Sequence, residues 1–71
     1  MQNSLVKIFV NGTPTEIPLD LNICMLLDQL DVQKKHIAIE INENIIFKTD
    51  WENTKLEEGD KIEIVKAIGG G

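Results

Sequence analysis

The amino-acid sequence predicts a two-layer α+β domain in which one helix lies across one face of a five-stranded sheet. Five short segments carry strand patterns bounded by turn residues, and a single segment has the hydrophobic period of a helix. One short helix buries its apolar stripe by lying against one face of a sheet. The chain has 71 residues and a mass of 8.0 kDa, which is room for one domain. We therefore expect one domain over residues 1–66 and a glycine-rich tail over residues 67–71.

The first two strands form a hairpin. Residues alternate in character from Leu5 to Val10, as expected for a strand with one buried face. Asn11-Gly12 follows, and this dipeptide tolerates the positive φ angles of a two-residue turn. The return strand, Thr13 to Leu19, contains two prolines, each of which removes a donor from the hydrogen-bond ladder. The second strand should therefore lie at an edge of the sheet.

The helix is predicted from about Ile23 onward. Between Ile23 and Leu30, apolar residues recur at i, i+3, i+4 and i+7, which places them on one helical face. Asn22 is a favourable N-cap residue. No glycine marks the C-terminus, and we expect the helix to stop near Asp31.

Three further strands are expected after the helix. They are Ile37 to Ile41, Ile45 to Phe47 and Lys61 to about Lys66, with turns at Asn42-Glu43-Asn44 and Glu58-Gly59-Asp60. Thr49 to Leu56 is predicted to be irregular or 3₁₀ structure, which Trp51 anchors in a small satellite core. The expected main core comprises Val6, Ile8, Val10, Ile17, Ile23, Leu26, Leu27, Leu30, Ile37, Ile39, Ile41, Leu56, Ile62 and Ile64.

Composition excludes several classes of function. Twelve acidic residues against seven lysines give a net charge of −5, which disfavours binding to nucleic acid. No apolar run is long enough for a membrane span, and the N-terminus lacks the pattern of a signal peptide. We therefore expect a cytoplasmic protein without a nucleic-acid or membrane partner.

The sequence offers no catalytic constellation and no metal site. Cys24 is the single cysteine, and it lies beside the apolar stripe of the predicted helix, where a structural role is expected. His36 is the single histidine and has no second histidine or cysteine nearby in the sequence. An enzyme is the poorest candidate function.

The tail carries the most informative chemistry. Ile68 is followed by Gly69, Gly70 and Gly71, which add no core contacts and lose much backbone entropy on ordering. We expect a flexible extension that can thread a narrow channel in another protein. The α-carboxylate of Gly71 can be activated there as an acyl adenylate and converted to a thioester, an amide or a thiocarboxylate.

The whole chain resembles the family of sulfur carrier proteins of thiamine thiazole biosynthesis. The resemblance rests on the order of the elements and on Val10-Asn11-Gly12, Ile23 to Leu30, Ile37 to Asn42 with Ile45-Ile46, Asp50-Trp51-Glu52, Glu58-Gly59-Asp60 and Ile68 to Gly71. It implies a β-grasp, or ubiquitin-like, fold, with a mixed sheet in which the first and last strands lie parallel at the centre.

The resemblance also implies a carrier that is a substrate of other enzymes. In this family an E1-like adenylyltransferase uses ATP and Mg²⁺ to adenylate the terminal glycine, here Gly71, while Ile68, Gly69 and Gly70 are recognised as the tail. Sulfur from a cysteine desulfurase or a sulfur relay then gives a thiocarboxylate, from which thiazole synthase takes the sulfur. The carrier itself binds no cofactor.

Five residues are candidates for docking on these enzymes. If the neighbours of Phe9 face the helix, Phe9 lies on the opposite face of the sheet, where Val65 can lie near it. The alternative, given equal weight, is that residues around Trp51 or Phe47 cover Phe9. Glu58, Asp60 and Glu63 stand close in sequence to the tail and either steer it electrostatically or are ordinary solvated residues.

Two other functions stay open. A sulfur carrier of another pathway, similar to the small subunit of molybdopterin synthase, shares the fold and a double-glycine end. A ubiquitin-like modifier begins with the same activation chemistry and differs in its acceptor, which is a lysine of a target protein.

Overall fold

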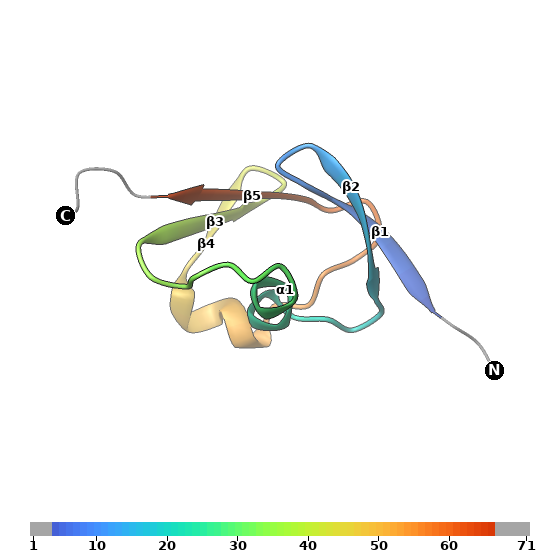
Figure 1. The fold of residues 1–71 in the computed structure, drawn as a ribbon, viewed down its shortest axis with the longest axis horizontal. Coiled ribbons are helices and arrows are strands. Elements are labelled where there is room, and N and C mark those ends of the chain that lie inside the picture. The colour runs from blue at the N-terminus through green and yellow to red at the C-terminus, as the bar shows by residue number, and fades with distance from the viewer. Residues whose placement is uncertain (1–3, 67–71) are drawn as a thin grey trace.

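The computed structural model describes residues 4–66, which form a mixed five-stranded sheet with an α-helix and a 3₁₀ helix on one face (Figure 1). The strand order across the sheet is β2-β1-β5-β3-β4. In chain order the elements are β1 (Leu5–Val10), β2 (Thr13–Pro18), α1 (Ile23–Gln29), β3 (Ile37–Ile41), β4 (Asn44–Ile46), η1 (Lys48–Asn53) and β5 (Lys61–Lys66). The predicted fold class is confirmed.

The first hairpin has the predicted turn and position. Asn11 has a φ of 48° and Gly12 a φ of 85°, and β1 and β2 pair antiparallel on either side of them. Both central residues of the turn thus have positive φ, as a two-residue hairpin loop requires. β2 lies at the edge of the sheet, as its prolines predict, and ends at Pro18, one residue before the expected Leu19.

Helix α1 starts where the sequence predicts and ends earlier. The side chain of Asn22 accepts a hydrogen bond from the backbone N–H of the third helical residue at 2.8 Å. The helix ends at Gln29 because Asp31 takes a left-handed conformation, with φ at 59°. The N–H of Val32 then reaches back to the carbonyl of Leu27 at 2.9 Å, which is the Schellman arrangement with aspartate in the usual place of glycine. No helix in residues 4–66 is long and apolar enough to cross a membrane.

The second hairpin differs from the expected one by one residue. Asn42 and Glu43 have φ angles of 52° and 73°, so the turn has two residues instead of the three expected. Asn44 therefore belongs to β4, where it pairs with Ile41. β4 ends at Ile46, and Phe47 precedes helix η1.

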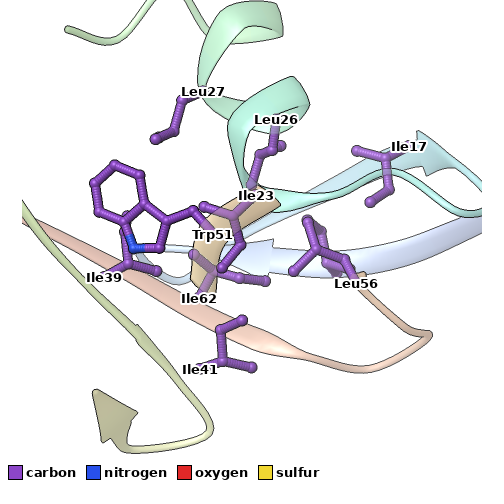
Figure 2. Packing of buried hydrophobic residues seen from close by; sticks show 10 residues of the cluster. Ile17, Ile23, Leu26, Leu27, Ile39, Ile41, Trp51, Leu56 and Ile62 are labelled. Atoms are coloured by element: carbon purple, nitrogen blue, oxygen red, sulfur yellow. The ribbon is translucent and has the colours of Figure 1, made fainter. Parts of the chain in front are cut away.

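Trp51 belongs to the main core, which corrects the prediction of a satellite core. Its side chain is 2% exposed, and its Nε1–H donates to the carbonyl of Ile46 at 2.9 Å. Figure 2 shows the indole among side chains from α1 and the sheet. The buried core comprises Ile8, Ile17, Ile23, Leu26, Leu27, Ile39, Ile41, Trp51, Leu56 and Ile62, and the other expected core residues pack against it partly buried.

Strand β5 lies at the sheet centre, parallel to β1 and antiparallel to β3. The direct pairing of β1 with β5 covers two residues of each strand, and side chains extend it at both ends. The carboxylate of Glu58 accepts from the N–H of Lys7 at 2.9 Å, and the side-chain oxygen of Asn11 accepts from the N–H of Ile64 at 2.7 Å. These two side chains take the place of backbone carbonyls where the strand partner is missing.

Candidate functional site

The tail residues of the predicted site, Ile68, Gly69, Gly70 and Gly71, lie outside the described residues, as does the boundary between residues 66 and 67. The described part of the site is therefore β5, which leads to them, and the surfaces around that strand. Ile62 and Ile64 pack toward the core, so Glu63 and Val65 lie on the opposite face of the sheet. We call this helix-free face the open face.

The open face carries an apolar patch over β5, β3 and β4. Val65 is 48% exposed and pairs with Ala38 on β3. Ile45 and Phe47 are 62% and 70% exposed, and the alternation around the inward-facing Ile46 places both on this face. Large apolar side chains gathered on one exposed sheet face are typical of a protein-docking surface. We define the apolar patch as Ala38, Ile45, Phe47 and Val65.

The structure does not bring Phe9 and Val65 together, contrary to the expectation. Phe9 is half-buried and pairs with Lys61 at the start of β5. Val65 lies four residues further along that strand, a separation of about 13 Å at roughly 3.3 Å per residue. The two side chains share the open face and belong to different parts of it.

The two aromatic residues expected as possible covers of Phe9 have other positions. Trp51 is buried in the core, and Phe47 is exposed within the apolar patch, next to β4 at the edge of the sheet opposite β2. Sequence reasoning missed the contribution of Ile45 and Phe47 to the open face. The available signal was the run Ile45-Ile46-Phe47, in which an inward-facing central residue forces both neighbours outward.

Glu58 and Asp60 have structural partners at the start of β5. The Asp60 carboxylate accepts from the N–H of Glu57 at 2.8 Å and from the side-chain amide of Asn42 at 3.1 Å. The tail follows the other end of β5, about 20 Å away at roughly 3.3 Å per residue. Glu58 and Asp60 are close to the tail in sequence, but they do not lie at the end of β5 from which the tail continues, so this part of the prediction is wrong.

Glu63 lies in the middle of the open face, directly opposite Glu40 on β3. Like charges at directly opposed positions of neighbouring strands repel each other and weaken the pairing. This pair separates Lys61 at one end of β5 from the apolar patch at the other. Glu63 is thus the one acid of the predicted docking set that borders the patch.

Cys24 and His36 occupy the positions expected of non-catalytic residues. Cys24 is a free, half-buried thiol packed against the core. His36 is exposed and has a φ of 59° in the turn before β3. Within residues 4–66, no group of three or more histidine, cysteine, aspartate or glutamate side chains is arranged to hold a metal ion.

Comparison with known proteins identifies the family. The model of the ThiS family matches residues 5–71, which is almost the entire chain. This chain belongs to the ThiS family. The resemblance stated from the sequence is thereby confirmed, together with the ubiquitin-like β-grasp fold of a sulfur carrier. ThiS proteins are small carriers and not enzymes.

Three individual proteins illustrate what the chain is similar to. The uncharacterized protein ycf40 of Porphyra purpurea is 35% identical over 71 residues, which cover all of both chains. A thiazole synthase of Paramagnetospirillum magneticum is 33% identical over 66 residues, covering 93% of this chain and 20% of that protein. The crystal structure of the thiamine biosynthesis protein ThiS from Geobacter metallireducens superimposes with a TM-score of 0.84 at 29% identity, covering 93% of this chain and all of that one.

Proposed function

We propose that this protein is the sulfur carrier of thiamine biosynthesis and that it delivers sulfur as a thiocarboxylate on Gly71. The observation that carries the proposal is the ThiS family match, which runs from residue 5 through the glycines to residue 71. The similar structure from Geobacter metallireducens is described as a thiamine biosynthesis protein, which supports the same pathway.

The chemistry follows from the weakness of a carboxylate as an electrophile. An E1-like adenylyltransferase binds ATP and Mg²⁺, and a carboxylate oxygen of Gly71 attacks the α-phosphorus while pyrophosphate leaves. The outer sulfur of a cysteine desulfurase or relay persulfide then attacks the carbonyl carbon, and AMP leaves. A thiol finally cleaves the resulting sulfur–sulfur bond, forming a disulfide with the donor and releasing the thiocarboxylate. The carrier supplies the reacting terminus and binds no cofactor of its own.

Thiazole synthase is the proposed acceptor of the sulfur. A stretch that makes up 20% of the Paramagnetospirillum magneticum thiazole synthase aligns with 93% of this chain. A carrier-like segment inside a thiazole synthase supports direct transfer of sulfur from the carrier to the synthase. Because ATP and cysteine are the source compounds, we place the reaction in the cytoplasm.

The fold has two tasks in this scheme. Strand β5 pairs with β1 at its start and with β3 up to Lys66, so the sheet holds the residue that precedes the tail. The apolar patch then docks the carrier on thiazole synthase, so that Ile68, Gly69 and Gly70 are recognised in the channel that leads to the synthase active site. Glu63 borders this contact on the open face, and Phe9 lies further away on the same face, at the start of β5.

The test of the function is intact-protein mass spectrometry. The chain is incubated with the adenylyltransferase, ATP, Mg²⁺, cysteine and a cysteine desulfurase, and a variant lacking Gly70 and Gly71 serves as the control. We expect one oxygen to be exchanged for sulfur in the C-terminal fragment of the full chain and no exchange in the control. An adenylate or enzyme thioester that never becomes a thiocarboxylate would favour protein conjugation instead.

The test of docking compares two exposed apolar residues. Phe47→Ser removes the most exposed large apolar side chain of the patch, while Leu19→Ser makes the same kind of change at a 51% exposed residue just after β2. We expect Phe47→Ser to weaken binding to thiazole synthase at least tenfold, because aromatic anchors dominate interfaces of this kind. Equal affinities of the two variants would contradict docking through the patch.

A further inference from the structure

A cleft of about 450 Å³ lies at the end of β5 from which the tail continues. Its lining includes Lys66, the last residue of β5, and Lys35 and His36 from the connection between α1 and β3. The sheet register fixes this arrangement, because Lys66 pairs with Ile37, the residue that follows His36. In Figure 1 the connection from α1 to β3 reaches the same end of the molecule as the arrowhead of β5.

The charge of this cleft is opposite to that of the protein as a whole. The chain has a net charge of −5, yet the cleft is lined by two lysines and the single histidine, with Asp31 as its acid. The adjacent Lys34 is paired with Asp28 at 2.7 Å. Among the residues that the structure describes, Lys35 and Lys66 make no salt bridge, and both are exposed.

The positive charges of the cleft stand where the tail begins. A tail that enters the active site of another protein brings the residues at its base against the rim of that active site. Lys66 immediately precedes the tail, and Lys35 lies beside it across the cleft. Whatever surface surrounds the entrance of the partner's channel therefore meets this positive region first.

We infer that the cleft formed by Lys35, His36 and Lys66 is the contact for aspartate or glutamate side chains at the channel entrance of the enzyme that adenylates the terminus. This inference rests on the proposed function, since it needs an enzyme that receives the tail. Carboxylates of the partner pair with the two exposed ammonium groups, orient the base of the tail and speed association with an otherwise negatively charged carrier. The apolar patch, proposed above to dock on thiazole synthase, is a separate surface.

The experiment uses charge reversal at matched exposed lysines. Lys35→Glu and Lys66→Glu change the cleft, and Lys55→Glu changes the net charge equally at a position outside it, where the ammonium lies 4.0 Å from an exposed carboxylate. Affinity for the adenylyltransferase is measured by calorimetry for each folded variant and for the wild type, at low and high salt. Thiocarboxylate formation by the wild type at saturating enzyme is measured in parallel.

We expect each cleft variant to bind about tenfold more weakly than the wild type, because an ion pair is replaced by repulsion, and Lys55→Glu to stay within about twofold. High salt should reduce the difference. Cleft variants that bind like Lys55→Glu would overturn the inference while the wild type still forms its thiocarboxylate. Tighter binding after charge reversal would also overturn it and would indicate that the cleft holds the chain's own terminal carboxylate. A wild type that neither binds nor is converted would refute the proposed function itself.

Discussion

The two ends of β5 both carry charged residues beside a turn, and they use those charges differently. At the start of the strand, the carboxylates of Glu58 and Asp60 accept hydrogen bonds from backbone and side-chain N–H groups. At its end, Lys35 and Lys66 line an open cleft and make no salt bridge within residues 4–66. The first set of charges is committed to the fold, and the second is available to a partner.

This difference shows why charge clusters in a sequence are poor guides to binding surfaces. An acid that replaces a missing backbone carbonyl is already satisfied, and a partner that bound it would compete with the fold. Lys35 and Lys66 make no salt bridge with the described residues, and both are exposed. Hydrogen-bond partners, which only the structure reveals, therefore separate the structural charges of β5 from the available ones.

The largest effect that tests this comparison is expected for Asp60→Ala. The substitution leaves the N–H of Glu57 and the amide of Asn42 without their acceptor, and hydrogen bonds to charged groups contribute about 1.5–3 kcal/mol each when well formed. Because the site is partly exposed, we expect a loss of about 2 kcal/mol in the free energy of unfolding, measured by urea denaturation. Asp60→Asn keeps one acceptor and should lose about half as much. If Asp60→Ala changed the free energy of unfolding by less than about 0.5 kcal/mol, the charges at the start of β5 would not serve the fold more than those at its end.

A smaller effect is expected for Glu58→Ala. The Glu58 carboxylate takes the place of a strand carbonyl for the N–H of Lys7, at 2.9 Å, and this single bond is exposed. Its removal should lower the free energy of unfolding by about 1 kcal/mol and speed hydrogen exchange at the Lys7 amide. Glu58→Gln retains an oxygen acceptor and is the matched control. Unchanged exchange at Lys7 in the alanine variant would contradict a structural role of Glu58.

Much of the fold follows from local sequence signals. The Asn11-Gly12 turn and the Asn22 cap are residue preferences that nothing in the tertiary structure opposes. The errors in where the helix ends and how long the second turn is arise because a non-glycine residue takes a positive φ, which sequence patterns rarely reveal. Asp31 ends the helix early in this way, and Glu43 shortens the second turn.

The candidate site was less predictable than the fold. Glu58 precedes the extended strand β5 and Lys66 ends it, so only Lys66 adjoins the tail, while residue patterns alone do not give the parallel pairing with β1. Lys35 and Lys66 are far apart in sequence and meet only through the β3–β5 register. Trp51 joins the main core for a similar reason, because tertiary packing turns a side chain from an irregular segment inward.

Stability should be almost insensitive to the charges at the end of β5. Lys35→Glu and Lys66→Glu are expected to change the free energy of unfolding by less than about 0.5 kcal/mol, since both side chains are exposed and make no salt bridge with the described residues. Thermal unfolding of both variants beside Asp60→Ala gives the direct contrast. A large loss in either lysine variant would mean that these charges, too, serve the fold.

The smallest expected effect concerns Lys34, which adjoins the cleft and is already paired. The hydrogen bond from its ammonium group to Asp28, at 2.7 Å, raises the pKa of Lys34. A pKa that is raised in the folded state means that the pair favours folding at neutral pH and that its contribution is lost as the pH rises through the pKa of Lys34. In Asp28→Asn we expect that pKa to fall back toward the ordinary lysine value, as followed by NMR of the side-chain amino nitrogen, with little change in stability at neutral pH. If the pKa stayed raised, Asp28 would not be the partner that neutralises Lys34, and Lys34 would then have to be counted with Lys35 and Lys66 as a charge available to the adenylyltransferase.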